Sequence, residues 1–256
     1  MDWAQQASAM LNSGDISAER FYQLAMAEDI AEAQMKMLLG FMQRLPRPQQ
    51  DPVWHELAAK YLPQLVERWR ADDSGPLTPS MRIINVISYT PYFIRFLGTP
   101  AGRGIAALHL HRVLQFSEAL TDASDADSIA EVNQFLATML LVQGIADVDA
   151  EEKKAVLVPL RAWVRKPAFR GKLASDASER VVWLLTEDRG MAVPLEMVRS
   201  KLREPLEGCA APGCTKTLST HNLQKCSRCK TALFCDKEHQ KFAWPSHKKL
   251  CFEPTF

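Results

Sequence analysis

The pattern of apolar positions predicts helices along most of the chain. Between Pro52 and Arg70, apolar residues recur at spacings of three and four, which is the period of a helix with one buried face. Residues 2–12 and 16–43 are rich in Ala, Met, Leu, Gln and Glu, which are strong helix formers, and we expect both stretches to be helical. Sustained alternation of apolar and polar residues, which would indicate strands, is missing from this sequence pattern.

Start and stop signals predict further helices. A hydroxyl cap followed by proline at Thr78-Pro79, the capping-box pattern of Ser124 to Asp127 and the acidic run from Asp149 each favour a helix start. Helices are expected to follow over 129–144, from 149, over 175–188 and over 194–203. Pro63 and Pro159 fall inside predicted helices, where proline removes a backbone donor, so we expect a kink or a break at each.

These signals predict an all-α domain over residues 1–204, with seven to nine helices. An irregular α-solenoid is one arrangement that would fit, although the sequence has no clean repeat period. A second, much smaller domain is expected over 205–256, with short paired strands around 224–235 and a helix from about Asp236 to Lys249. The expected fold class is therefore mainly α, with a small C-terminal domain that contains a short β-hairpin and a helix.

Composition changes the picture at the end of the chain, because all six cysteines lie in the last 48 residues. With two histidines they form four pairs of nitrogen and sulfur ligands: Cys209-x4-Cys214, Cys226-x2-Cys229, Cys235-x3-His239 and His247-x3-Cys251. Structural zinc takes four such ligands and leaves no position open. Eight ligands therefore predict two closed zinc sites and no leftover cysteine.

Three disulfides are the alternative reading of six cysteines. Near its start the sequence has Asp2, no basic region and no uninterrupted apolar stretch, so it predicts no signal peptide. Clustered Cys-x2-Cys pairs outside an oxidising compartment are typical of metal sites, and disulfides would not need histidines at ligand spacing. Zinc is therefore the favoured prediction.

The residues between these pairs resemble the MYND-type zinc finger over about residues 209–251. The resemblance is carried by the Cys-Ser-x-Cys start at Cys226, by Phe234 before Cys235, by Gln240 and Trp244, and by the closing His-Lys-x-x-Cys from His247 to Cys251. Three features depart from the family pattern: the sixth ligand is His239 where Cys is usual, the first pair is spaced x4, and Ala243 stands where an acidic residue often precedes the Trp. Histidine is a competent zinc ligand, so the first departure changes the softness of the site more than its geometry.

The resemblance implies ligand sets and a role. It assigns Cys209, Cys214, Cys235 and His239 to one zinc, and Cys226, Cys229, His247 and Cys251 to the other. It also implies that Gln240 and Trp244, which share one helix face at i,i+4, line a groove for proline-rich segments of partner proteins. Trp244 could equally be a core aromatic that covers the second zinc, and both roles could hold together. His221 lies off the ligand spacing and is expected to be a loop residue.

Other function classes fit the sequence less well. A RING module usually closes with Cys-x2-Cys, whereas this chain closes with His247-x3-Cys251. A SET methyltransferase domain is β-rich with its own cysteine ligands, whereas the region before Cys209 has no cysteine and is predicted to be helical. In the helical region, His109 and His111 are two residues apart, whereas chelation from one helix needs i,i+4, and no phosphate loop or nucleophile elbow occurs. We therefore expect a protein that binds partners rather than an enzyme. The helical domain could also be the main binding surface, with the finger as a structural cap.

Charge disfavours a nucleic-acid-binding protein. Residues 205–256 hold eight Lys and Arg against four Asp and Glu, and the whole chain has a formal net charge of +1. Such a small surplus supports weak, salt-sensitive phosphate contact, so a nucleic-acid-associated transcriptional regulator remains an alternative only.

The longest apolar run, Phe135 to Ala146, is too short to span a bilayer. We expect an intracellular protein, since zinc-binding thiols must stay reduced, and the sequence does not distinguish cytoplasm from nucleus.

Overall fold

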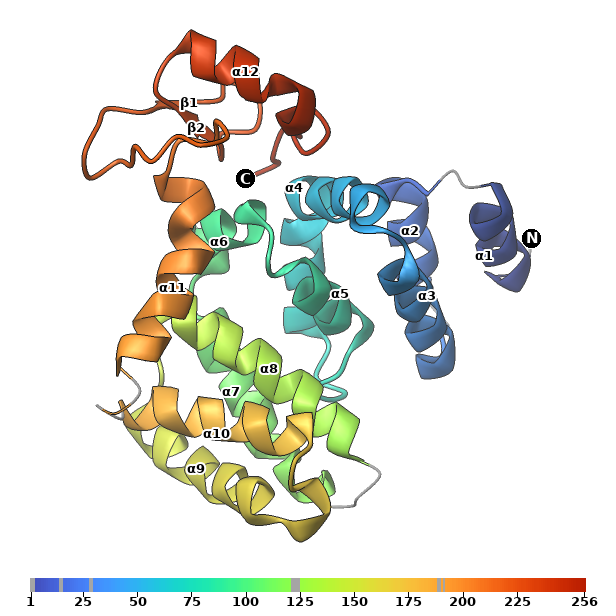
Figure 1. Ribbon diagram of the computed structural model, residues 1–256. Coiled ribbons are helices and arrows are strands. Elements are labelled where there is room, and N and C mark those ends of the chain that lie inside the picture. Colours follow the sequence, from blue (N-terminus) through green and yellow to red (C-terminus); the bar gives the residue numbers. More distant parts are fainter. Residues whose placement is uncertain (1–2, 14–15, 28–29, 121–124, 188–189, 191) are drawn as a thin grey trace. The chain divides into compact units, whose positions relative to one another are not determined.

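The computed structural model describes residues 3–13, 16–27, 30–120, 125–187, 190 and 192–256 (Figure 1). Within these residues the chain is mainly helical, with one two-stranded antiparallel sheet near its end, as the sequence predicts. The α-helices are α1 (Trp3–Ser13), α2 (Ala18–Ala25), α3 (Glu32–Arg44), α4 (Arg47–Ala71), α5 (Pro79–Ile87), α6 (Pro91–Leu97), α7 (Ile105–Phe116), α8 (Ala126–Gln143), α9 (Ala150–Arg165), α10 (Leu173–Thr186), α11 (Ala192–Glu207) and α12 (Lys237–His247). The strands are β1 (Gln224–Lys225) and β2 (Leu233–Phe234), and short 3-10 turns cover η1 (Pro100–Gly102), η2 (Ser117–Ala119) and η4 (Pro167–Phe169).

The contacts between residues divide the chain into two compact units. The first comprises Met1–Trp69, Pro79–Phe93 and Pro205–Phe256, and the second comprises Arg70–Thr78 and Ile94–Glu204. The helical region expected as one domain over 1–204 is thus shared between the two units. The segment from 205 onward belongs with the N-terminal helices.

Helix α4 forms the centre of the first unit's core. Its apolar side chains at Trp54, Leu57, Leu62, Leu65 and Trp69 are almost completely buried. Phe21 of α2 packs edge-on against Trp54, with 5.1 Å between ring centroids. This burial on nearly every turn is what the spacing of three and four predicts.

The helical stretch predicted over 16–43 is divided into two helices, because α2 ends at Ala25 and α3 begins at Glu32. The side chain of Gln34 accepts a hydrogen bond from the backbone N–H of Ala31 at 2.8 Å, which marks the start of α3. Arg68 of α4 donates to the backbone carbonyl of Met26 at 3.2 Å, just after α2. Tertiary contacts thus replace the helical hydrogen bonds that propensity alone would continue. Residues 28 and 29 lie outside the described residues.

In the second unit, α7, α8, α9 and α10 pack on one another. Helix α8 contacts α7 and α10, and α9 contacts the same two helices. Successive pairs α7–α8 and α9–α10 therefore stack on each other. A solenoid would need further pairs in series, so that arrangement stays a prediction.

The expected helix boundaries mostly hold. Helix α5 begins at Pro79, and the Asp149 side chain caps α9 by accepting from the backbone N–H groups of Glu151 and Glu152 at 2.9 and 3.0 Å. Helix α8 covers the stretch predicted over 129–144, α10 that over 175–188 and α11 that over 194–203, each with slightly shifted ends. Ser124 and Asp188, which the predictions placed at helix ends, lie outside the described residues.

The break predicted as one outcome at Pro63 and Pro159 does not occur. Helix α4 runs through Pro63, and α9 runs through Pro159. The other outcome, a kink, stays a prediction. Proline still leaves the carbonyl four residues earlier without its helical donor, so packing must compensate for the loss.

Candidate metal centres

The last segment of the chain folds around the short strand β2. On one edge β2 pairs with β1, with Gln224 opposite Phe234. On its other edge Leu233 forms a bridge with Cys209, and its carbonyl accepts from the N–H of Ala210 at 2.8 Å. Helix α12 packs against β2, and Figure 1 shows both close to the C-terminal end of the chain. Strand and helix together bring distant ligand pairs within reach of one another.

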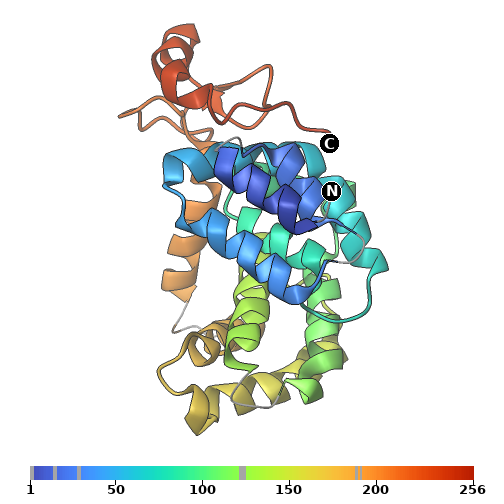
Figure 2. The same cartoon turned by 90° about the vertical axis from the view of Figure 1, so that its right-hand side faces the viewer.

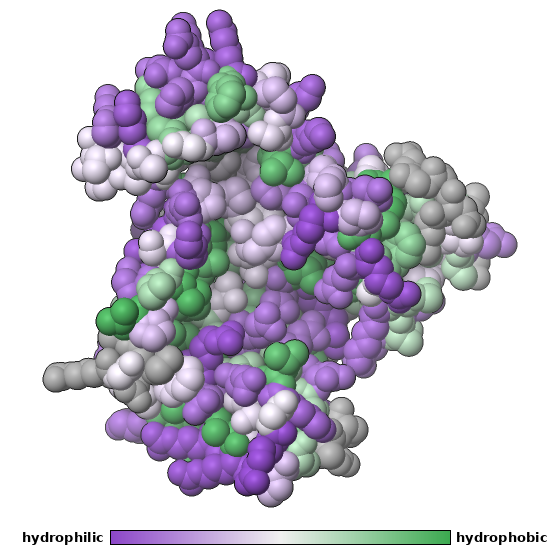
Figure 3. Space-filling model, viewed as in Figure 1, coloured by the Kyte–Doolittle hydropathy of each residue, from purple (hydrophilic) through white to green (hydrophobic). Residues whose placement is uncertain are grey.

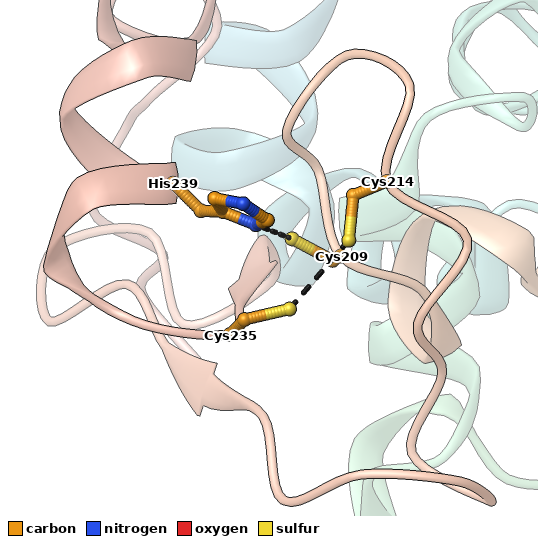
Figure 4. A group of neighbouring side chains, drawn as sticks. All are labelled: Cys209, Cys214, Cys235 and His239. Atoms are coloured by element: carbon orange, nitrogen blue, oxygen red, sulfur yellow. Dashed lines mark hydrogen bonds between the residues drawn. The ribbon is translucent and has the colours of Figure 1, made fainter.

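The first cluster joins residues from three places. Cys209 and Cys214 come from the loop before β1, Cys235 follows β2, and His239 lies in the first turn of α12. Their side chains point toward one another (Figure 4), with 3.4 Å between Cys209 Sγ and His239 Nδ1 and 3.6 Å between the sulfurs of Cys214 and Cys235. All four ligand atoms lie within 4.8 Å of one another.

The second cluster has the same size. Cys226 and Cys229 lie between the strands, and His247 and Cys251 lie at and beyond the end of α12. The Cys226 and Cys251 sulfurs are 3.7 Å apart, and Cys229 Sγ is 3.8 Å from His247 Nε2. These four ligand atoms also lie within 4.8 Å of one another.

The spacing within both clusters fits zinc. With zinc–sulfur bonds of about 2.3 Å, the edge of a tetrahedron is about 3.8 Å, close to the observed separations. A disulfide would need about 2.05 Å between sulfurs, and all six cysteines are free. The chain therefore carries two Cys/His clusters that could each bind one zinc ion, for two per chain.

Turn chemistry explains how the unusual x4 spacing of the first pair is accommodated. Pro212 and Gly213 occupy the centre of a turn that is closed by the N–H of Cys214 on the carbonyl of Ala211 at 3.0 Å. Gly213 has φ +76°, and proline followed by a positive-φ glycine is the usual pattern of a type II turn. The turn brings Cys214 back toward Cys209 despite the longer connection.

In the second cluster a tight turn spans Cys226 to Lys230. The N–H of Lys230 donates to the carbonyl of Cys226 at 3.0 Å, and Lys230 takes up a left-handed conformation with φ 58°. The N–H of Cys226 then donates to the carbonyl of Ala232 at 2.9 Å. The chain thus reverses within one Cys-x2-Cys pair, which points both sulfurs to the same side.

The protonation of these thiols shows why a cation suits the clusters. Burial and the neighbouring thiol of Cys214 raise the pKa of Cys235 to about 12. Burial and the charge of Cys229 raise the pKa of Cys251 to about 12. Burial opposes ionisation of Cys229 too, but hydrogen bonds from His247, Thr231 and backbone N–H groups outweigh it and lower its pKa to about 5. Crowded thiols cannot all ionise beside one another, whereas a bound dication makes this possible.

Comparison with protein families decides what this segment is. Residues 209–251 match the family model of the MYND finger. This segment is a MYND finger. The fold class, the two Cys/His clusters and the sequence resemblance all agree with this assignment, which makes the segment a zinc-binding protein-interaction module. Comparison with curated proteins and with solved structures found no match to the chain.

The two residues expected to bind peptides both lie on α12 of the MYND finger. Trp244 is 41% exposed, and Gln240, one turn earlier, is half-buried. The Trp244 ring lies 5.8 Å from the ring of His247, so it is beside one ligand of the second cluster while remaining open to solvent. His221 lies in an exposed loop outside both clusters, as expected.

The histidines of the helical region do not form a metal site with each other. His109 is fully buried and hydrogen-bonds through Nε2 to the carbonyl of Val132 at 3.0 Å, whereas His111 is exposed and pairs with Glu152. His55 is buried on α4 with its ring edge-on to Tyr92 at 5.9 Å. Among the described residues, the two groups of the MYND finger are the Cys, His, Asp and Glu clusters compact enough for a metal ion. No helix in the described part of the chain has both the length and the apolar composition needed to cross a bilayer.

Sequence reasoning did not find several residues around the clusters. Thr231 is buried and contributes a hydrogen bond to the Cys229 thiol, which the turn after a Cys-x2-Cys pair could have indicated. Tyr92 and Thr255 hydrogen-bond between the MYND finger and the N-terminal helices. No local pattern could have indicated these two, because their partners are more than 150 residues away in sequence.

Proposed function

We propose that the MYND finger recruits partner proteins by binding proline-rich segments on the face of α12 that carries Gln240 and Trp244. The exposure of Trp244 is the observation that carries this proposal. A large aromatic side chain that stays 41% exposed on a small metal-held domain offers apolar contact area to a ligand. Figure 3 shows the visible face of the MYND finger as largely hydrophilic, with small hydrophobic patches.

The strand order supports the binding mode. Both edges of β2 are occupied, one by β1 and the other by the segment at Cys209. Both residues of β1, Gln224 and Lys225, are exposed, so an extended segment could add to the sheet beside them. Proline-rich segments are already extended before they bind, so they lose little conformational entropy and need only a small surface.

Binding by the zinc-loaded full chain to an array of proline-rich peptides tests this function. Trp244→Ala should weaken binding to the selected peptides by roughly thirtyfold or more, as expected for an aromatic anchor that the bound peptide would bury. Phe242→Ala is the matched control, because Phe242 is also an exposed aromatic of α12, at 66% exposed, but lies two positions away and faces elsewhere. Equal binding by the wild type and both variants, or a loss confined to Phe242→Ala, would contradict the proposed site.

A second candidate function is that the MYND finger stabilises the helical region as a structural cap. Two hydrogen-bonded contacts with the segment 250–256 favour it: the Tyr92 hydroxyl of α6 donates to a backbone carbonyl of this segment, and the Ala59 carbonyl of α4 accepts from the N–H of Thr255. No peptide binding by folded, zinc-loaded protein would shift the proposal to this function, with the helices as the main binding surface. In both cases we propose binding without catalysis, in a reducing intracellular compartment, with nucleic acid as the less favoured partner.

A further inference from the structure

A backbone carbonyl of α4 has lost its helical partner and gained one from the end of the chain. In an α-helix the carbonyl of Ala59 would accept from the N–H of residue 63, but Pro63 has no N–H. Instead the N–H of Thr255 donates to the Ala59 carbonyl at 3.0 Å. The hydroxyl of Thr255 lies 3.4 Å from the same oxygen and 3.2 Å from the carbonyl of Lys60. Ala59 itself is fully buried, so its carbonyl needs a donor from the protein.

A second attachment lies at Tyr92, at the start of α6. Its side chain is fully buried, and its hydroxyl accepts a hydrogen bond from the N–H of Phe252 at 2.8 Å. The same hydroxyl is 2.9 Å from the carbonyls of Leu250 and of Phe252, to either of which it can donate its one proton. The residue between these two, Cys251, belongs to the second Cys/His cluster.

All these contacts lie within the first unit of the chain. Figures 1 and 2 show the last residues leaving the MYND finger and ending beside the N-terminal helices. His55 of α4 packs edge-on against the Tyr92 ring, which ties the two attachment points to one helix. Residues 252–256 thus connect the second Cys/His cluster to the core helix α4.

We propose that residues 252–256 are a built-in strap that docks the MYND finger on α4 and α6. Its two attachment points are the Tyr92 hydroxyl and the Ala59 carbonyl, which Pro63 leaves without a helical donor. The strap couples the two parts of the first unit. Metal binding by His247 and Cys251 fixes residues 250–252 against Tyr92, and docking of residues 252–255 in turn restrains Cys251. By linkage, a change that favours metal binding by the second cluster must also favour docking of the strap, and the reverse must hold as well.

Hydrogen exchange of individual backbone amides in the zinc-loaded full chain tests the Tyr92 attachment. Tyr92→Phe removes only the hydroxyl, and it should lower the protection of the Phe252 amide by about fivefold, the effect of losing one hydrogen bond. Tyr89→Phe is the matched control, since the Tyr89 hydroxyl bonds to Asp51 at 2.8 Å and not to the strap. Circular dichroism should show unchanged helicity in both variants.

The coupling has a second readout in zinc release to a colorimetric chelator, 4-(2-pyridylazo)resorcinol. Tyr92→Phe should speed the release of one of the two zinc ions by about fivefold and leave the other unchanged, because the strap flanks only the second cluster. Unchanged amide protection or unchanged release in Tyr92→Phe, or the same effect in Tyr89→Phe, would overturn the proposal. These readouts do not involve peptide binding, so they stand or fall apart from the proposed function.

Pro63→Ala tests the second attachment point, the Ala59 carbonyl. Alanine restores an N–H that competes for the Ala59 carbonyl, so protection of the Thr255 amide should fall by about fivefold even though alanine favours the helix. Pro52→Ala, which changes a proline of the same helix away from the strap, should leave that amide unchanged. If Pro63→Ala leaves the Thr255 amide as protected as in the wild type, the Ala59 carbonyl is not an attachment point for the strap, and this result would contradict the proposal.

Discussion

The side chain of His109 is fully buried in the second unit, against the ring of Phe135 at 5.0 Å. Burial and, to a smaller extent, the cation of Arg112 lower its pKa, the bond to the Val132 carbonyl partly offsets them, and the net result is a pKa lowered from 6.5 to about 4. The folded protein therefore holds His109 neutral at a pH where the unfolded chain would protonate it. Because the carbonyl can only accept, the proton of the neutral ring lies on Nε2.

This burial predicts a pH dependence of stability. Between pH 6.5 and about 4 the unfolded state binds more protons than the folded state, so the free energy of unfolding falls as the pH falls. His109 should account for about 2 kcal/mol of the loss between about pH 7 and pH 5. Chemical denaturation of the wild type and His109→Gln at both pH values, at equal zinc concentration, should show this difference. His111→Gln, which changes the exposed neighbour, should keep the wild-type dependence, and a His109→Gln protein that also keeps it would contradict the prediction.

The sequence predicted single residues well where their partners are close in the chain. Cys226 and Cys229, or His247 and Cys251, reveal a metal site because each pair must hold one edge of a tetrahedron. Tyr92 gives no such signal, because an isolated tyrosine in a helix has the same local pattern whether its hydroxyl is exposed or bonded 160 residues away. Long-range backbone contacts leave no periodic trace in the sequence.

At the scale of elements, helix α10 is attached to α8 through a buried polar pair. The amide of Asn133 donates to the hydroxyl of Ser178 at 2.9 Å, and that hydroxyl donates to the carbonyl of Ala174 at 2.6 Å. Both side chains are completely buried. A buried donor is costly to leave without an acceptor, so the pair fixes how the two helices face each other.

Ser178→Ala should therefore destabilise the second unit by about 1–3 kcal/mol, because it leaves the Asn133 amide without this acceptor in the core. The measurement is chemical denaturation followed by circular dichroism. Thr186→Ala is the control from the same helix, since Thr186 makes a similar bond to a backbone carbonyl but is exposed, and it should change stability by less than about 0.5 kcal/mol. Equal costs for the two variants would show that burial of the pair contributes nothing.

Helix positions were predictable, but the number of helices was underestimated. The described residues before the MYND finger contain eleven α-helices, against the seven to nine expected. Part of the excess comes from the stretch 16–43, which has continuous helix propensity but is divided into α2 and α3. Propensity is a local quantity, whereas the position of that division depends on Arg68, which lies 42 residues beyond Met26.

At the scale of the whole molecule, the chain combines a metal-held module with units held by apolar packing. About 50 residues cannot bury enough surface to fold alone, so metal binding has to supply that stability. The helices α7 to α10 of the second unit contain none of the clustered cysteines. Loss of zinc should therefore affect the two units differently.

Elemental analysis of chelator-free protein should find two zinc ions per chain. His239→Ala should release metal from the first cluster and unfold the MYND finger, while circular dichroism shows that most of the helicity remains. His221→Ala is the control, because His221 is a histidine of the same module outside both clusters, and it should retain two zinc ions. One zinc ion or none in the wild type would contradict the two-site assignment, and a collapse of all helices in His239→Ala would show that the chain is a single folding unit.

The order in which the ligand pairs alternate has a mechanical consequence. A force that pulls Cys209 away from His247 passes from Cys209 through the first cluster to His239 and then along α12 to its end at His247. The second cluster lies off this load path, since Cys226 is in the loop that the first cluster closes. When the first cluster ruptures, the loop that it closed is pulled straight. The load then reaches the second cluster. The MYND finger should thus open under tension in a fixed sequence that chain connectivity alone dictates, whichever metal is bound more tightly at rest.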